Sequence, residues 1–147
     1  MELFYAIHIL YIEMISDFEL VFRIILAVAL GSIIGFEREK EDKPAGLRTH
    51  VLVSLGSAQF TILSFYAFPG SDPARIAAYV VVGIGFIGAG TIIRSSDRII
   101  GVTTAASLWV VSSIGMACGI GFYLASVIVT IITFITLRAK KIEKKLH

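Results

Sequence analysis

The stretch IIGVTTAASLWVVSSIGMACGIGFYLASVIVTIITFITL, residues 99–137, contains no Asp, Glu, Lys or Arg. A helix needs about 20 apolar residues to cross the hydrocarbon core of a membrane, so this stretch is long enough for two crossings. A Gly-Ile-Gly triplet at 119–121 lies near its middle, and closely spaced glycines mark turns. The sequence therefore predicts two membrane-spanning helices, at about 101–118 and 121–137, with a tight turn between them.

Three further spans are expected before this stretch. Charge-free runs predict spans at about 49–68 and 74–93. A less apolar span at about 18–36 must include Glu19 and Arg23, which are four residues apart on a helix and can pair. The preceding residues 1–16 are too short for another span and are predicted to form an interfacial segment or an extension of the first helix.

The composition supports a membrane protein. The chain has 147 residues, of which 56% are hydrophobic and only 16% charged, with a mean hydropathy of +0.87. A soluble domain of this length cannot bury so much apolar surface, and a net charge of +2 is too small to indicate nucleic-acid binding. The single cysteine, Cys118, excludes a disulfide within the chain.

The distribution of basic residues predicts the orientation. Eleven of the thirteen Lys and Arg residues follow the first, third and fifth spans, and they include a basic tail at 138–147. Loops rich in Lys and Arg stay in the cytoplasm. We therefore expect an all-α integral membrane protein, a bundle of five transmembrane helices over residues 17–137, with its N-terminus outside, its C-terminus cytoplasmic and its location in the cell membrane.

Closely spaced glycines predict tight helix packing, because small residues let helix backbones approach each other within a membrane. In the third span they also satisfy a dinucleotide-binding pattern, but that pattern requires a preceding strand, and this copy lies in an apolar run. A broken helix that lines an ion path is a further alternative there. The glycines assigned to packing are Gly31, Gly35, Gly83, Gly85, Gly88, Gly90, Gly115 and Gly119.

The polar loop at 37–49 has two interpretations. Its acids and bases cancel, which is typical of a solvated loop whose long side chains reach the membrane interface. Alternatively, Arg38 and Arg48 form a fixed cluster that binds a carboxylate, a lipid phosphate or a partner. Near the opposite side, Ser71 or Asp72 is expected to cap a helix that has Pro73 in its first turn.

Enzymatic and metal-binding patterns are missing from the sequence. There is no zinc-ligand spacing, nucleophile elbow or phosphate-binding loop, so we expect no catalytic activity and no cofactor. No acidic residue falls in the middle of a predicted span, so the sequence does not show a carboxylate-lined ion path, and whether a metal binds is left open.

Several blocks resemble one family in the same order along the chain. They are Gly35-Phe-Glu-Arg-Glu39, Lys43-Pro-Ala-Gly-Leu-Arg-Thr-His50, Asp72-Pro-Ala-Arg75, Gly83-Ile-Gly-Phe-Ile-Gly-Ala-Gly90 and Thr103-Thr-Ala-Ala-Ser-Leu-Trp109. The chain resembles the MgtC/SapB family of bacterial and archaeal inner-membrane proteins. The resemblance implies a five-helix membrane domain, and we expect a short form without the ACT-like C-terminal domain of longer members.

The family resemblance also carries functional expectations. It implies a role in adaptation to low magnesium and in intracellular survival and virulence, and an association with the F-type ATP synthase. It implies functional positions at Asp17, Arg23, Glu37, Arg38, Lys43, Arg48, Thr49, Asp72, Arg75, Arg94, Thr103 and Thr104.

Two functional hypotheses follow. The first is a non-enzymatic regulator that binds another membrane complex and forms a homo-oligomer, with a dimer favoured by the small-residue faces. The second is a channel or transporter for magnesium or another cation, with a path near the Gly-rich third span.

Overall fold

The computed structural model describes residues 16–68, 71–94 and 97–146, and side chains up to residue 139. These residues form five helices and one short antiparallel hairpin. The expected segment at 1–16 therefore lies outside the described residues, apart from Ser16. The elements are α2 (Asp17–Lys40), α3 (Leu47–Tyr66), α4 (Ala74–Ala89), β1 (Ile93–Arg94), β2 (Ile99–Ile100), α5 (Val102–Gly119) and α6 (Tyr123–Leu146).

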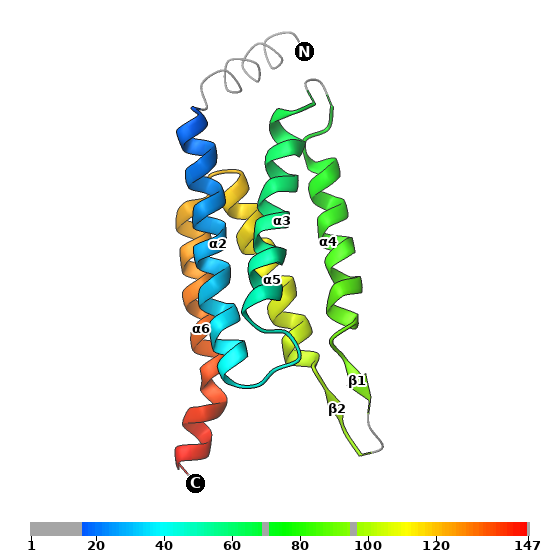
Figure 1. Ribbon diagram of the computed structural model, residues 1–147, viewed down its shortest axis with the longest axis vertical. Coiled ribbons are helices and arrows are strands. Elements are labelled where there is room, and N and C mark those ends of the chain that lie inside the picture. Colours follow the sequence, from blue (N-terminus) through cyan, green and yellow to red (C-terminus); the bar gives the residue numbers. More distant parts are fainter. Residues whose placement is uncertain (1–15, 69–70, 95–96, 147) are drawn as a thin grey trace.

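The helices form an up-and-down bundle with α5 at its centre (Figure 1). Helix α5 contacts all four other helices, whereas α4 contacts only its neighbours α3 and α5 to any extent. The core is formed mainly by α2, α3 and α5, where Ala27, Ile34, Ala58 and Val111 are completely buried. Helix α4 is therefore an edge helix with most of its surface exposed.

Glycine and serine allow α2, α3 and α5 to pack backbone against backbone. A Cβ added to Gly31 would lie 2.7 Å from Ser54 Cβ, and one added to Gly119 would lie 2.8 Å from the Ala58 carbonyl oxygen. A Cβ added to Gly115 would lie closer still to the Ser54 carbonyl oxygen. The serine at this crossing also donates a hydrogen bond from Oγ to the Ala27 carbonyl oxygen, 2.7 Å away. The three helices thus meet at one small side chain, Ser54.

The all-α fold class is confirmed, and so is the turn between the last two helices. Helix α5 ends at Gly119, and Gly121 has a φ of +84°, which favours glycine. Two helices, α2 and α5, are long and apolar enough to cross a membrane by length and composition, while α4 and the apolar part of α6 are shorter. The five transmembrane spans and their orientation remain predictions.

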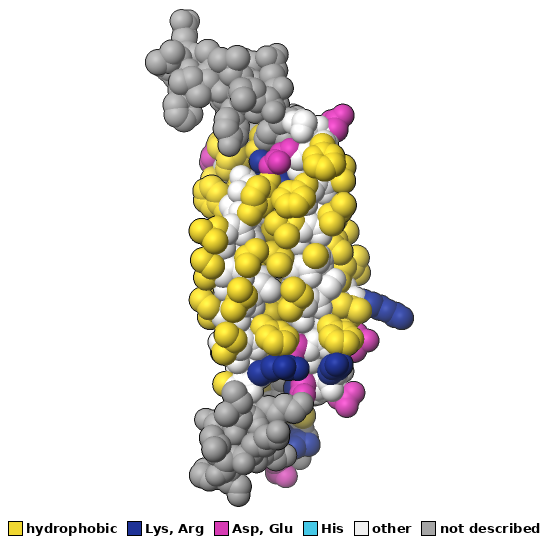
Figure 2. All heavy atoms as spheres, turned by 90° about the vertical axis from the view of Figure 1, so that its left-hand side faces the viewer, with side chains coloured by type: hydrophobic (Ala, Val, Ile, Leu, Met, Phe, Trp, Pro, Cys, Tyr) yellow, Lys and Arg dark blue, Asp and Glu magenta, His cyan; other side chains and the backbone are white. Residues whose placement is uncertain are grey.

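The molecule has an apolar middle and one end at which Lys and Arg side chains gather beside Asp and Glu side chains. Figure 2 shows hydrophobic side chains covering the middle of one face, with Lys and Arg gathered toward the lower end. We call this the basic end. It carries the loop between α2 and α3, in which Lys43 is exposed, together with exposed Lys40 and Arg48 at the adjoining helix ends.

The hairpin at the basic end differs from the expectation of a third span that continues to residue 93. Helix α4 ends at Ala89, and Ile93–Arg94 then pairs with Ile99–Ile100. Gly101 follows the hairpin with a φ of +96°, and a Cβ there would overlap the Thr91 carbonyl oxygen. In the sequence, Ile92-Ile93-Arg94 and Arg98-Ile99-Ile100 stand on either side of three polar residues, and this arrangement was the signal for the two strands.

The close packing at Gly115 predicts a position-specific effect on stability. Gly115→Ala should lower the free energy of unfolding by about 1–3 kcal/mol, because the added methyl group overlaps backbone of α3. Gly85→Ala is the matched control in α4, since no atom lies within 4 Å of its added Cβ. Thermal unfolding of both variants in the same detergent measures the difference. Equal midpoints for the two variants would contradict the backbone contact.

Candidate functional site

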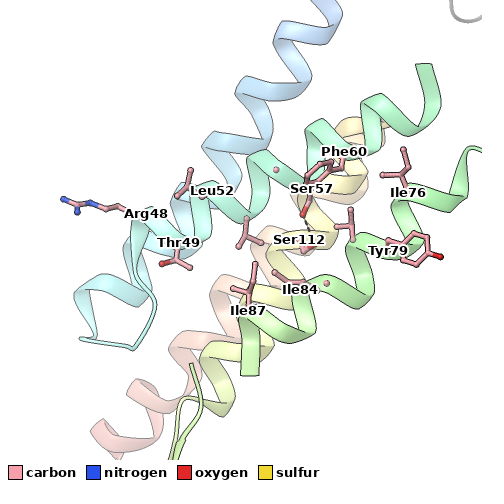
Figure 3. A pocket seen from close by; sticks show the side chains of 14 residues that line it. Arg48, Thr49, Leu52, Ser57, Phe60, Ile76, Tyr79, Ile84, Ile87 and Ser112 are labelled. Carbon is pink, nitrogen blue, oxygen red and sulfur yellow. Dashed lines mark hydrogen bonds between the residues drawn. The ribbon is translucent and has the colours of Figure 1, made fainter. Parts of the chain in front are cut away.

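A groove with a volume of about 640 Å³ lies between α3 and α4. Figure 3 shows side chains from both helices along its length. Its lining is mostly apolar. From α3 it includes Arg48, Thr49, Leu52, Val53, Gly56, Ser57 and Phe60, from α4 Ile76, Tyr79, Val80, Gly83, Ile84 and Ile87, and from α5 Ser112.

Two glycines give the groove its depth. Gly56 on α3 and Gly83 on α4 both have no atom within 4 Å of an added Cβ. Helix α4 buries only Ala77, Ile84 and Gly88, which form a narrow stripe against its neighbours. The helix therefore rests on the bundle along one line and leaves a hollow beside that line.

The hydroxyl groups at the floor of the groove already hydrogen-bond within the protein. The hydroxyls of Ser57 and Ser112 lie 2.8 Å apart and hydrogen-bond to each other across α3 and α5. Thr61, one turn further along α3, donates to the Ser57 carbonyl oxygen at 2.8 Å. The groove thus offers an apolar surface, with its hydroxyls already paired.

A buried guanidinium ties four helices together at the end opposite the basic end. The Arg23 side chain donates to Glu19 Oε1 at 3.1 Å, to the Tyr66 hydroxyl at 2.9 Å and to the Gly119 carbonyl oxygen at 2.8 Å. It also lies 3.2 Å from the hydroxyl of Tyr123, which in turn donates to Glu19. The expected pairing of Glu19 with Arg23 is confirmed. Because its side chain bonds to residues of α2, α3, α5 and α6, we call Arg23 a structural centre of the bundle.

A second buried cluster lies near the basic end. Glu37 and Arg38 form an ion pair, and both side chains are buried. His50 is also completely buried, with Nδ1 2.8 Å from the Gly46 carbonyl oxygen and Nε2 3.0 Å from Ser107 Oγ. These contacts fix the loop before α3 and join α3 to α5. Arg38 is therefore buried, whereas Arg48 is exposed. The surface cluster of Arg38 and Arg48, which the loop sequence suggested as one alternative, is not formed by these described side chains.

The family-implied positions do not gather in one place. Four of them are buried: Arg23 at the end opposite the basic end, the ion-paired Glu37 and Arg38 near the basic end, and Thr104, whose carbonyl oxygen accepts a hydrogen bond from Ser107 Oγ. Exposed positions lie at both ends, and Thr49 is half-buried beside the groove; the exposed ones are Asp17, Lys43, Arg48, Asp72, Arg75, Arg94 and Thr103. Asp72 Oδ1 accepts a hydrogen bond from the Ala74 backbone N–H at 2.9 Å, but Pro73, rather than Ser71 or Asp72, occupies the N-cap position of α4.

The packing glycines divide into two groups. Gly31, Gly35, Gly115 and Gly119 lie where an added Cβ would overlap a neighbouring helix. Gly88 makes ordinary contact with Ala105, and Gly90 ends α4, where its N–H bonds to Phe86 and Gly88 carbonyl oxygens. Gly83 and Gly85 contact no helix of the described chain, so the packing predicted for these two is wrong within a single copy. Their spacing resembled that of packing glycines, but α4 lies at the edge of the bundle.

The Gly-rich third span is not unwound. Helix α4 is continuous from Ala74 to Ala89, and its neighbouring groove is apolar. Among the described residues, no three His, Cys, Asp or Glu side chains are placed to hold a metal ion. The sequence did not indicate that Gly56, Ser57, Phe60 or Ser112 belong to a site. The signal for the groove was the pair Gly56 and Gly83, which tertiary structure places opposite each other.

Comparison with known proteins places this architecture in a family. The sequence matches the model of the MgtC family over residues 24–146, which include every described helix except the start of α2. The chain belongs to the MgtC family. No solved structure matches the chain.

Relatives of this MgtC-family chain are substantially longer. The chain is 46% identical over 127 residues to YhiD of Escherichia coli (strain K12), which is named as a candidate magnesium transporter, and the match covers 81% of this chain and 59% of YhiD. It is 43% identical over 120 residues to protein MgtC of Salmonella typhimurium (strain LT2), covering 82% of this chain and 52% of that protein. The chain thus spans a little over half the length of these relatives. Together with the apolar helices, the family match indicates a membrane protein.

The network around Arg23 predicts a second stability effect. Arg23→Gln should lower the free energy of unfolding by roughly 1.5–3 kcal/mol, because hydrogen bonds to a buried charged group are lost. Arg75→Gln is the control, since the Arg75 side chain is exposed and makes no hydrogen bond or ion pair with the described residues. Unfolding in detergent, followed by the accessibility of the buried Cys118 thiol, compares the two variants. Similar unfolding curves would show that Arg23 is not a structural centre.

Proposed function

We propose that this protein is a non-enzymatic membrane protein of magnesium homeostasis that acts by binding another membrane protein at the outward face of α4. This outward face consists of Ala78, Val82, Gly85, Phe86 and Ala89, all exposed in the described bundle. The observation that carries the proposal is that α4 is continuous but largely uncovered, with Val82 74% and Phe86 87% exposed.

The arrangement of the outward face suits helix association. Ala78, Val82, Gly85 and Ala89 follow the three- and four-residue spacing that places side chains on one side of a helix. Gly85 has no atom within 4 Å of an added Cβ, so another helix can approach its backbone closely. In a membrane, such close contact at small residues drives association, because lipid removes the hydrophobic force between helices.

The partner that we propose is a membrane subunit of the F-type ATP synthase. The family resemblance supports this choice, and the magnesium-related names of the relatives support a role in adaptation to low magnesium. Intracellular survival and stress adaptation would follow from the same regulation. A second copy of this chain on the outward face is the competing occupant, and it would give the dimer expected from the sequence.

Photo-crosslinking tests which protein covers the outward face. A photo-activatable amino acid at Val82 should give adducts with an ATP synthase subunit in native membranes, identified by mass spectrometry. The same amino acid at Leu124 of α6 is the control, because Leu124 is 75% exposed and so matches Val82. Gly85→Leu should reduce the adducts from position 82 at least severalfold by blocking close approach.

Three results would contradict the proposal. They are equal adduct yields at positions 82 and 124, adducts from position 82 with only a second copy of this chain, and adducts unaffected by Gly85→Leu. Transport is the alternative function suggested by the name of YhiD. Magnesium flux into proteoliposomes that contain only the purified protein would favour transport over regulation.

A further inference from the structure

The groove between α3 and α4 has the length of one lipid chain. Along α3 its lining runs from Thr49 to Phe60, and along α4 from Ile76 to Ile87. At about 1.5 Å of rise per residue, either segment is roughly 17 Å long. One leaflet contributes about half of a hydrocarbon core roughly 30 Å thick, so the groove extends through about one leaflet.

The width of the groove favours a chain over a helix. Helices α3 and α4 contact each other beside the groove, and they enclose about 640 Å³. An α-helix with its side chains is about 10–12 Å across and needs both neighbours to move apart. Spread over a length of roughly 17 Å, the hollow of about 640 Å³ has a mean cross-section of roughly 40 Å², which is less than a helix occupies, and the paired Ser57 and Ser112 hydroxyls lie at its floor.

The positively charged side chain of Arg48 lies at one end, or mouth, of this apolar groove. The Arg48 side chain lies at the basic end and is exposed. It makes no hydrogen bond or ion pair with any described residue. In Figure 3 its side chain extends outward from the end of the groove, next to Thr49. A guanidinium recognises a phosphate group through paired hydrogen bonds, and basic residues at a membrane surface attract anionic lipids.

We propose that the α3–α4 groove binds one acyl chain of an anionic phospholipid, whose phosphate group contacts Arg48 at the mouth. The Thr49 hydroxyl lies at the same mouth and can donate a further hydrogen bond to the phosphate. This lipid site is separate from the outward face of α4, because Gly83 lines the groove and Gly85 does not. The two surfaces can therefore be altered independently.

Lipid retention by the 147-residue chain tests the groove. Native mass spectrometry after titration of the detergent-solubilised protein with dioleoyl phosphatidylglycerol should detect one lipid that binds more tightly than the rest. Gly83→Leu and, separately, Gly56→Leu should weaken this binding about tenfold, because each leucine fills the groove from one side. Gly85→Leu is the matched control and should retain the lipid, although it blocks the proposed partner contact.

Headgroup selectivity tests the role of Arg48. Dioleoyl phosphatidylcholine has the same chains without a net negative charge, so the wild type should prefer phosphatidylglycerol about fivefold to tenfold. Arg48→Gln should remove most of this preference while the acyl chain still enters the groove. Arg75→Gln, at the opposite end of the bundle, should keep the preference.

Distinct results would overturn the lipid site. Equal phosphatidylglycerol binding by the wild type and both groove variants would show that no chain occupies the groove. A dimer that is lost in Gly83→Leu, without a change in bound lipid, would identify a second copy as the occupant. Unchanged headgroup preference in Arg48→Gln would exclude the proposed phosphate contact. None of these results depends on whether the outward face binds a partner.

Discussion

The backbone contact among α2, α3 and α5 at Ser54 is the constraint on which the other features of the bundle depend. Gly31 and Gly115 approach this serine from two sides, and neither position has space for a Cβ. The Ser54 hydroxyl donates a hydrogen bond to the Ala27 carbonyl oxygen of α2. Because these three helices are held so closely, α5 occupies the centre, while α4 is left with only a narrow line of contact. The exposed α4 surface is thus a consequence of tight packing elsewhere.

Polar groups inside the bundle hydrogen-bond to one another and hold its helices together. Arg23 joins four helices at one end, and His50 with the Glu37–Arg38 pair fixes the loop at the other. Between them, serine and threonine hydroxyls bond to one another, to carbonyl oxygens of their own helices or, at Ser54, to a carbonyl oxygen of α2. No buried side-chain nitrogen or oxygen of the described residues lacks a partner. The recognition surfaces that we propose accordingly lie on the outside of the bundle, where α4 is uncovered.

Helix α4 presents two different surfaces because its glycines point in different directions. Gly83 opens the groove toward α3, while Gly85 leaves the outward face flat. Two residues along a helix correspond to about 200° of rotation, so one short Gly-rich segment serves two sides. A lipid in the groove would support α4 against α3 and keep the outward face in place. Lipid composition could in this way affect how a partner is bound.

The residues alone predict the helical class, the glycine turn after α5, the pairing of Glu19 with Arg23 and the family. Each depends on local spacing, charge or motif order. Only the tertiary structure decided that Gly115 packs against α3 while Gly83 and Gly85 remain open. It also decided that Glu37 and Arg38 are buried rather than solvated. The physical reason is that a lipid-facing position and a helix-facing position are equally apolar, so hydropathy cannot distinguish them.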